Sequence, residues 1–141
     1  MRIKRETDYA IRCVTYLAAR RGQIAVIEEI SKNALVPGKF LAKILQKLAR
    51  AGIVKSHRGV KGGFELAREP ALINFLEITE AIQPVEMNAC VLDDRACALS
   101  GTCAVHPVWI EVRKEVRKIL ARRNFAHIRP VGAGKGQNKT G

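Results

Sequence analysis

The sequence has few aromatic residues, no long apolar run and no recognisable export signal. Aromatic side chains make up 5% of the 141 residues, so a core must consist mainly of Leu, Ile, Val and Ala. Because no run of about 18 apolar residues occurs, the sequence excludes a membrane-spanning helix. The first eight residues do not lead into an uninterrupted apolar segment, which argues against a signal peptide and predicts a cytoplasmic protein.

Acidic residues are also scarce, with 13 Asp and Glu against 25 Lys and Arg, which gives a formal net charge of +12. This excess favours a polyanionic partner, either nucleic acid or an anionic membrane surface. Residues 1–68 carry 15 basic and 5 acidic residues (net +10), residues 69–106 carry 1 and 6 (−5), and residues 107–141 carry 9 and 2 (+7). We therefore expect a basic module, a short acidic segment and a basic C-terminal part.

The four cysteines are unevenly placed. Cys90, Cys97 and Cys103 all lie in the acidic segment. Disulfides are disfavoured in a reducing cytosol, so three thiols in one segment predict a metal-binding or redox role. Cys13 instead lies on the apolar face of a predicted helix, where we expect a buried structural thiol.

The first part of the sequence predicts three helices. The first begins at Thr7 as its N-cap, ends at Gly22 and has apolar residues at helical spacing: Ala10, Cys13, Val14, Leu17 and Ala18. A second helix follows over residues 26–32. A third begins at Pro37, whose missing N–H suits a first helical turn, and ends at Gly52. Its predicted buried face consists of Leu41, Ile44, Leu45 and Leu48.

Two short β-like runs, over residues 53–56 and 64–67, follow the third helix. The basic loop between them contains three glycines, which predicts a β-hairpin. Helix, turn, helix and then a basic hairpin is the order of a winged helix-turn-helix, so we expect a mainly α-helical fold with a two-stranded wing. Asn74 and Glu77 then predict the capping box of a short helix over residues 75–82.

The face of the third helix that remains exposed is basic and suits DNA. Such a helix can enter the major groove, where its first turn reaches base edges and its Lys and Arg residues neutralise phosphates. The glycines of the hairpin allow its backbone to approach a phosphate or a minor groove. A solvated basic helix face is the simpler alternative, but helix, wing and charge together favour double-stranded DNA as the partner. The predicted DNA-binding residues are Lys39, Phe40, Lys43, Lys47, Arg58, Gly59 and Lys61.

Three stretches of this sequence resemble a known family. The stretches 7–12, 40–54 and 58–67 look like motifs of the IscR-type winged-helix regulators, which include NsrR nitric-oxide sensors, RirA iron regulators and CymR regulators without the cluster cysteines. The resemblance covers about residues 1–127. It implies a dimeric bacterial transcription factor, most often a repressor. It also implies an iron–sulfur cluster, which many members bind through three cysteines before the last helix.

The cysteine segment is similar to the cluster motif of that family. It reads Cys90-x6-Cys97-x5-Cys103, with a first gap one residue longer than usual, and continues Cys103-x2-His106-x2-Trp109. Three thiolates and one imidazole suit iron–sulfur or zinc, although the short Cys-x2-Cys zinc motif is absent. We expect an iron–sulfur cluster, preferably [2Fe–2S] with [4Fe–4S] as a possibility. A zinc site, free thiols or a redox disulfide are the alternatives.

Two residues compete as the fourth cluster ligand. The resemblance to IscR-like members suggests His106 on a [2Fe–2S] cluster, whereas the resemblance to NsrR-like members suggests Asp8, reaching across the dimer to a [4Fe–4S] cluster. We prefer His106, because imidazole is the commoner neutral ligand and its spacing from Cys103 is local. The family often has Glu where Ala42 stands and Ser where Lys39 stands, so its operator sequence cannot be carried over.

A final helix is expected from Pro107 to about Asn124. It presents one apolar stripe, formed by Val108, Val112, Val116, Ile119 and Leu120. We expect a partner helix of a second chain to cover this stripe, which gives a homodimer with recognition helices about 34 Å apart for a palindromic operator. The alternative is a monomer whose helix folds back onto its own module.

These features divide the chain into four parts. We assign residues 1–83 to the winged helix-turn-helix domain, 84–106 to a cluster-binding loop, 107–127 to a dimerisation helix and 128–141 to a flexible tail. No phosphate-binding loop, activated nucleophile or paired carboxylates occur, so we predict no enzyme, no small-molecule substrate and no membrane partner. The predicted function is a DNA-binding regulator that senses cluster status, redox state or nitric oxide; the alternative is a winged-helix regulator with a zinc or thiol-switch site.

Overall fold

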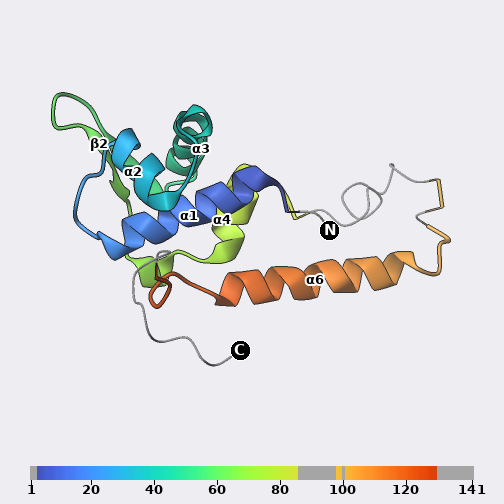
Figure 1. The fold of residues 1–141 in the computed structure, drawn as a ribbon. Coiled ribbons are helices and arrows are strands. Elements are labelled where there is room, and N and C mark those ends of the chain that lie inside the picture. Colours follow the sequence, from blue (N-terminus) through green and yellow to red (C-terminus); the bar gives the residue numbers. More distant parts are fainter. Residues whose placement is uncertain (1–2, 86–97, 100, 130–141) are drawn as a thin grey trace.

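The computed structural model describes residues 3–85, 98–99 and 101–129 (Figure 1). Its elements, in chain order, are α1 (Arg5–Ala19), α2 (Ile27–Ala34), α3 (Gly38–Arg50), β1 (Val54–His57), β2 (Gly63–Leu66), the 3-10 turn η1 (Pro70–Leu72), α4 (Phe75–Ile82) and α6 (His106–Arg122). This order confirms the predicted winged helix-turn-helix and the long helix that follows it. No helix within the described residues has the length and apolarity needed to cross a membrane.

Helix α1 has the predicted apolar face but begins earlier than predicted. Ala10, Cys13 and Val14 are fully buried in the core. The N-cap is Lys4, whose backbone is extended, and not Thr7. The Thr7 hydroxyl is buried inside the first turn and donates to Gln83 Oε1 at 3.1 Å. A hydrogen bond to a residue 76 positions away therefore replaces the local capping bond that the sequence suggested.

The turn between α2 and α3 positions α3. Leu35 adopts a left-handed conformation (φ 55°), and Ser31 accepts a backbone hydrogen bond from Val36 and returns one from its hydroxyl to the Val36 carbonyl. Pro37 is the N-cap of α3 rather than its first residue, and Gly38 begins the helix. The predicted buried face of α3 is confirmed, with Leu41, Ile44, Leu45 and Leu48 all 0 or 1% exposed.

Strands β1 and β2 form the wing as one antiparallel pair, in which Val54 lies opposite Leu66 and His57 opposite Gly63. Each strand is shifted by one residue from its predicted bounds. Ala25, in the segment between α1 and α2, exchanges two backbone hydrogen bonds of 2.8 Å with Phe64 of β2. The wing is therefore attached to this segment close to its loop end.

Helix α4 follows η1 and confirms the predicted capping box. The Glu77 N–H donates to Asn74 Oδ1 at 2.9 Å, and the Asn74 N–H donates to Glu77 Oε2 at 3.0 Å. Helix α4 packs against α1, α3 and α6. It thus joins α1 and α3 to the final helix.

Helix α6 lies on the side of α1 and α4 away from α3, and its N-terminal half extends beyond the helical module (Figure 1). It contains no buried residue and contacts α4, where Arg117 pairs with Glu80. The predicted apolar stripe of α6 is only partly covered within the chain. Three residues, Val112, Val116 and Leu120, are half-buried, while Val108 and Ile119 remain 50% and 45% exposed.

The chain turns back onto the module after α6 ends at Arg122. Phe125 is 1% exposed and stacks on Phe75 with ring centroids 4.5 Å apart. The helix ends shortly before the expected end at about Asn124, and a buried aromatic side chain attaches the following segment to the core. Of the expected tail, residues 130–141 lie outside the described residues.

Candidate nucleic-acid interface and cysteine segment

The N-terminal turn of α3 presents two exposed lysines. Lys39 and Lys43 are exposed, and the Lys39 Nζ lies 4.9 Å from the centroid of the Phe40 ring. Phe40 is half-buried and packs on Tyr9 of α1, with ring centroids 5.8 Å apart. Phe40 therefore supports the recognition helix from behind, while the two lysines are available to a polyanion.

Lys47 differs from the other predicted DNA-binding lysines. Its Nζ lies 3.3 Å from Glu6 Oε2 of α1, and both side chains are partly exposed. This ion pair neutralises part of its charge, so we expect Lys47 to contribute less to DNA affinity than Lys43. Sequence patterns do not indicate Glu6, because it lies 41 residues away and its helical face alone does not predict this partner.

The tip of the wing is a tight, basic turn. Arg58, Gly59 and Lys61 are all exposed, and the Gly62 N–H donates to the Gly59 carbonyl at 2.9 Å. A Cβ at Gly62 would lie 2.4 Å from the His57 carbonyl oxygen, so this turn requires glycine there. The turn presents Arg58 and Lys61 on a narrow backbone loop that can approach a duplex closely.

The exposed cations of this face have no acidic partners in the part of the chain that the structure describes: none of its carboxylates forms an ion pair with Lys43, Arg58 or Lys61. An acidic side chain does occur within the wing itself, where Glu65 lies 2.9 Å from His57 Nε2. Sequence reasoning missed this pair, although alternation along β1 and β2 places both residues on one face of the hairpin.

Asp8, the rival cluster ligand, lies exposed on α1. Its carboxylate pairs with Arg12 at 2.8 Å, one helical turn further on. Arg12 also donates to the carbonyl of Leu35 in the helix-turn-helix turn at 3.1 Å. Sequence spacing reveals the Asp8–Arg12 pair but not the link from Arg12 to the turn before the recognition helix.

Two of the predicted cluster ligands, Cys90 and Cys97, lie outside the described residues. Cys103 and His106 lie in one turn at the start of α6, where the His106 N–H donates to the Cys103 carbonyl at 3.3 Å, and both residues are half-buried. Within the described residues, no group of three or more metal-ligating side chains occurs.

Cys13 is separate from this segment. It is 0% exposed in the core, and burial raises the pKa of its thiol to about 12. A thiol that keeps its proton at neutral pH is a poor metal ligand and a poor nucleophile. The structure therefore agrees with the expected structural role of Cys13.

Comparison with known proteins places the chain among regulators of transcription. The sequence profile of the Rrf2 family, described as "Iron-dependent Transcriptional regulator", matches residues 3–129. A protein of Aquifex aeolicus, named as a candidate HTH-type transcriptional regulator, is 34% identical over 112 residues, which are 77% of this chain and 78% of that protein. The HTH-type transcriptional regulator NsrR of Bacillus subtilis is 29% identical over 115 residues, 79% and 78% of the two chains.

Solved structures share the fold. The structure of IscR from T. potens has a TM-score of 0.71 and 23% identity, covering 89% of this chain and 84% of that one. The structure of CymR, the global cysteine regulator of B. subtilis, has a TM-score of 0.68 and 24% identity, covering 89% and 93%. At these identities the likeness concerns the fold and confirms the winged-helix architecture.

Proposed function

Since this chain belongs to the Rrf2 family of transcriptional regulators, which are not enzymes, we propose that it binds a palindromic operator in double-stranded DNA as a homodimer. We also propose that an iron–sulfur cluster on Cys90, Cys97, Cys103 and His106 adjusts this binding. On this proposal, residues 84–106 form the cluster loop and residues 107–127 the dimerisation segment. The protein would work in the cytoplasm, most often as a repressor.

The observation that supports DNA binding is the unneutralised charge of α3 and the wing. Lys39 and Lys43 on α3, and Arg58 and Lys61 on the wing, are exposed on the two elements that a winged helix-turn-helix applies to DNA. The α3 residues would enter the major groove, and the glycine-containing wing would follow the backbone or minor groove. Phosphate contacts supply affinity, and base contacts from the first turn of α3 supply specificity.

Measuring operator affinity against salt concentration tests this docking. We expect Lys43→Ala and Arg58→Ala each to weaken binding. A lost phosphate contact would flatten the slope of log affinity against log salt by about 1, whereas a lost base contact would cost about 1–3 kcal/mol of discrimination. Lys47→Ala is the matched control on the same helix and should have a smaller effect, because Glu6 already neutralises part of its charge. Unchanged affinity in both Lys43→Ala and Arg58→Ala would contradict the proposed interface.

The donor set of the cysteine segment supports an iron–sulfur cluster. Cys103 and His106 lie in one turn and combine a soft thiolate with an imidazole, a pair that suits iron. A bound cluster would supply sensitivity to iron, oxidants or nitric oxide. The chain itself supplies the connection to DNA, because the turn with Cys103 and His106 leads directly into α6. A signal changes DNA affinity only if it favours one arrangement of the recognition helices over another.

Metal analysis of anaerobically isolated protein, with its absorption spectrum, tests the cluster. We expect iron and sulfide in the wild type, and Cys97→Ser should lose both while keeping the fold. Cys13→Ala is the control and should keep its iron, because Cys13 is buried away from the segment. His106→Ala and Asp8→Ala compare the two candidate fourth ligands, and we expect the larger loss of iron from His106→Ala. Colourless protein that contains zinc, or no metal at all, would instead support the zinc or thiol-switch regulator.

A further inference from the structure

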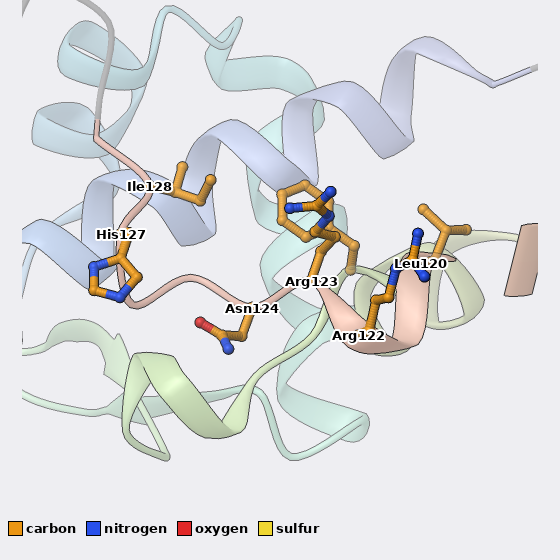
Figure 2. Close-up of a pocket in the computed structure, with 7 residues that line it drawn as sticks. Leu120, Arg122, Arg123, Asn124, His127 and Ile128 are labelled. Carbon is orange, nitrogen blue, oxygen red and sulfur yellow. The ribbon is translucent and has the colours of Figure 1, made fainter. Parts of the chain in front are cut away.

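A pocket of about 340 Å³ lies where α6 ends (Figure 2). This volume is within the range of small-molecule sites, about 300–1,000 Å³, and too small for a folded partner or a duplex. The side chains that line it come from the start of α4, the last turn of α6 and the segment after it: Phe75, Leu120, Arg122, Arg123, Asn124, His127 and Ile128.

The backbone around this pocket is held by long-range hydrogen bonds. The Phe75 N–H donates to the Arg123 carbonyl at 3.0 Å, and the Phe125 N–H donates to the Pro70 carbonyl at 3.1 Å. The buried Phe125 stacks on Phe75, which itself lines the pocket. The α4 wall and the segment after α6 are therefore joined through the core, so the pocket is built by tertiary packing rather than by a loose loop.

The charged side chains of the pocket have no acidic partner among the described residues. In the middle of α6, Arg117 pairs with Glu80 and Lys118 pairs with Glu115. At the end of α6, by contrast, no ion pair within the described part of the chain includes Arg122, Arg123 or His127. Two exposed arginines thus line the pocket, and no carboxylate of the described residues pairs with them.

The polar groups at the pocket are mostly donors. A guanidinium only donates hydrogen bonds, and the Asn124 side-chain oxygen already accepts from the Ala126 N–H at 2.9 Å, which leaves the Asn124 amide NH2 for a ligand. Phe75, Leu120 and Ile128 add apolar walls. Because the pocket offers hydrogen-bond donors, it favours an anionic ligand, and the planar guanidinium group matches a carboxylate. The apolar walls favour a ligand whose remaining part is a hydrocarbon.

We propose that this pocket binds a small carboxylate with an aromatic or branched apolar body. The carboxylate would accept hydrogen bonds from the arginines, Arg122 and Arg123, and the apolar body would lie against Phe75, Leu120 and Ile128. Such a ligand would contact α4 and α6 together. Its affinity would then depend on how α6 sits on the DNA-binding module, which would give a regulator of this kind a second input besides its cysteine segment.

The test is an NMR titration of the isotope-labelled full chain with 3-phenylpropanoate and with its neutral counterpart 3-phenylpropanamide. We expect saturable shifts of the backbone amides of Phe75, Asn124, His127 and Ile128 with the acid. The neutral amide should bind at least about tenfold more weakly, as expected when a charge-assisted hydrogen bond is lost. Neither DNA nor a cluster ligand takes part in this experiment, so its result does not depend on the function proposed above.

Charge-matched variants locate the binding. The double variant Arg122→Gln with Arg123→Gln should weaken binding of the acid at least about tenfold. Its control, Lys114→Gln with Lys118→Gln, removes the same charge from α6 outside the pocket and should bind as the wild type does. The spectra recorded without ligand report whether each variant is folded. The single variant Arg122→Gln measures separately how much Arg122 contributes to binding of the acid.

Several results would overturn the proposal. Shifts that do not saturate, or that scatter over the surface, would show nonspecific binding. Equal binding of acid and amide would show an apolar site without anion recognition. An unaffected double variant, or no shift at the four amides because a second copy of the chain covers them, would show that the pocket is not a carboxylate site.

Discussion

Gln83 joins the beginning of α1 to the end of α4. Its side-chain oxygen accepts from the Thr7 hydroxyl at 3.1 Å and from the Lys4 N–H at 3.2 Å, and Thr7 and Gln83 are both buried. Buried polar groups are costly to leave unpaired, so these bonds stabilise one particular packing of α1 on α4. This matters for function, because α1 carries Glu6 and Asp8 and also packs behind the recognition helix.

Thr7→Val should therefore destabilise the fold. The change keeps the shape of the side chain but removes one buried hydrogen bond, and we expect the free energy of unfolding to fall by about 1 kcal/mol. Thr15→Val is the control on the same helix, because its hydroxyl only donates to the local Ile11 carbonyl at 2.8 Å. Urea unfolding measures the free energy of unfolding of both variants. A Thr7→Val variant as stable as wild type, or no more affected than Thr15→Val, would show that the Gln83 bond contributes little.

At the scale of the element, the glycines of the wing differ in importance for its structure. Gly63 has φ 154°, and a Cβ there would lie 2.5 Å from the Ala25 carbonyl oxygen, at the point where the wing joins the helices. Gly59 also has a positive φ of 99°, but it faces open space. A side chain at position 63 must therefore disturb the contact between β2 and Ala25, whereas one at position 59 strains only its own backbone.

We expect Gly63→Ala to lower stability by about 1–3 kcal/mol and to weaken operator binding, because the strained backbone and the close contact displace β2 from Ala25. Gly101→Ala is the control, since a Cβ there meets no atom within 4 Å. Its stability should stay within about 0.5 kcal/mol of wild type. Thermal or urea unfolding measures the stability of both variants, and DNA titration measures operator binding by Gly63→Ala. Equal stability of the two variants would show that the contact between β2 and Ala25 tolerates a side chain at position 63.

On the scale of the whole molecule, α6 keeps several large apolar side chains exposed to solvent. The helix packs on α4 through its half-buried residues, so part of the predicted stripe is covered within the chain itself. Val108 (50%), Trp109 (37%) and Ile119 (45%) stay exposed on the same helix. An exposed apolar helix side of this kind favours association, and two-fold pairing would place two recognition helices on one face of DNA.

Val108→Asp should convert a dimer into a monomer. A carboxylate buried without a partner in the interface would cost several kcal/mol of association, while the exposed position leaves the single-chain fold intact. Val60→Asp is the matched control, because Val60 is fully exposed on the wing and far from α6 in sequence. Sedimentation at micromolar concentration measures the oligomeric state. A monomeric wild type, or a Val108→Asp variant that still dimerises, would refute the role of this helix side.

Local sequence patterns predicted the main elements of the winged-helix fold. The buried face of α3, the glycine-containing basic loop and the Asn74–Glu77 capping box were all readable from the sequence and are present in the structure. Each depends on residues only a few positions apart: helical periodicity, turn chemistry or a hydrogen bond between neighbours. The cluster ligands remain a prediction from cysteine spacing and from resemblance, since Cys90 and Cys97 lie outside the described residues.

Other features were decided by tertiary structure alone. Thr7 is a buried partner of Gln83 rather than a helix cap, Lys47 is paired with Glu6, and Phe125 ends α6 by entering the core. The sequence determines which side chains are polar, charged or apolar. Which distant partner each one meets depends on how the helices pack, because these contacts join residues 41 to 76 positions apart or elements at opposite ends of the chain. Packing must satisfy all of these contacts together, so no local sequence pattern determines which distant residues become partners.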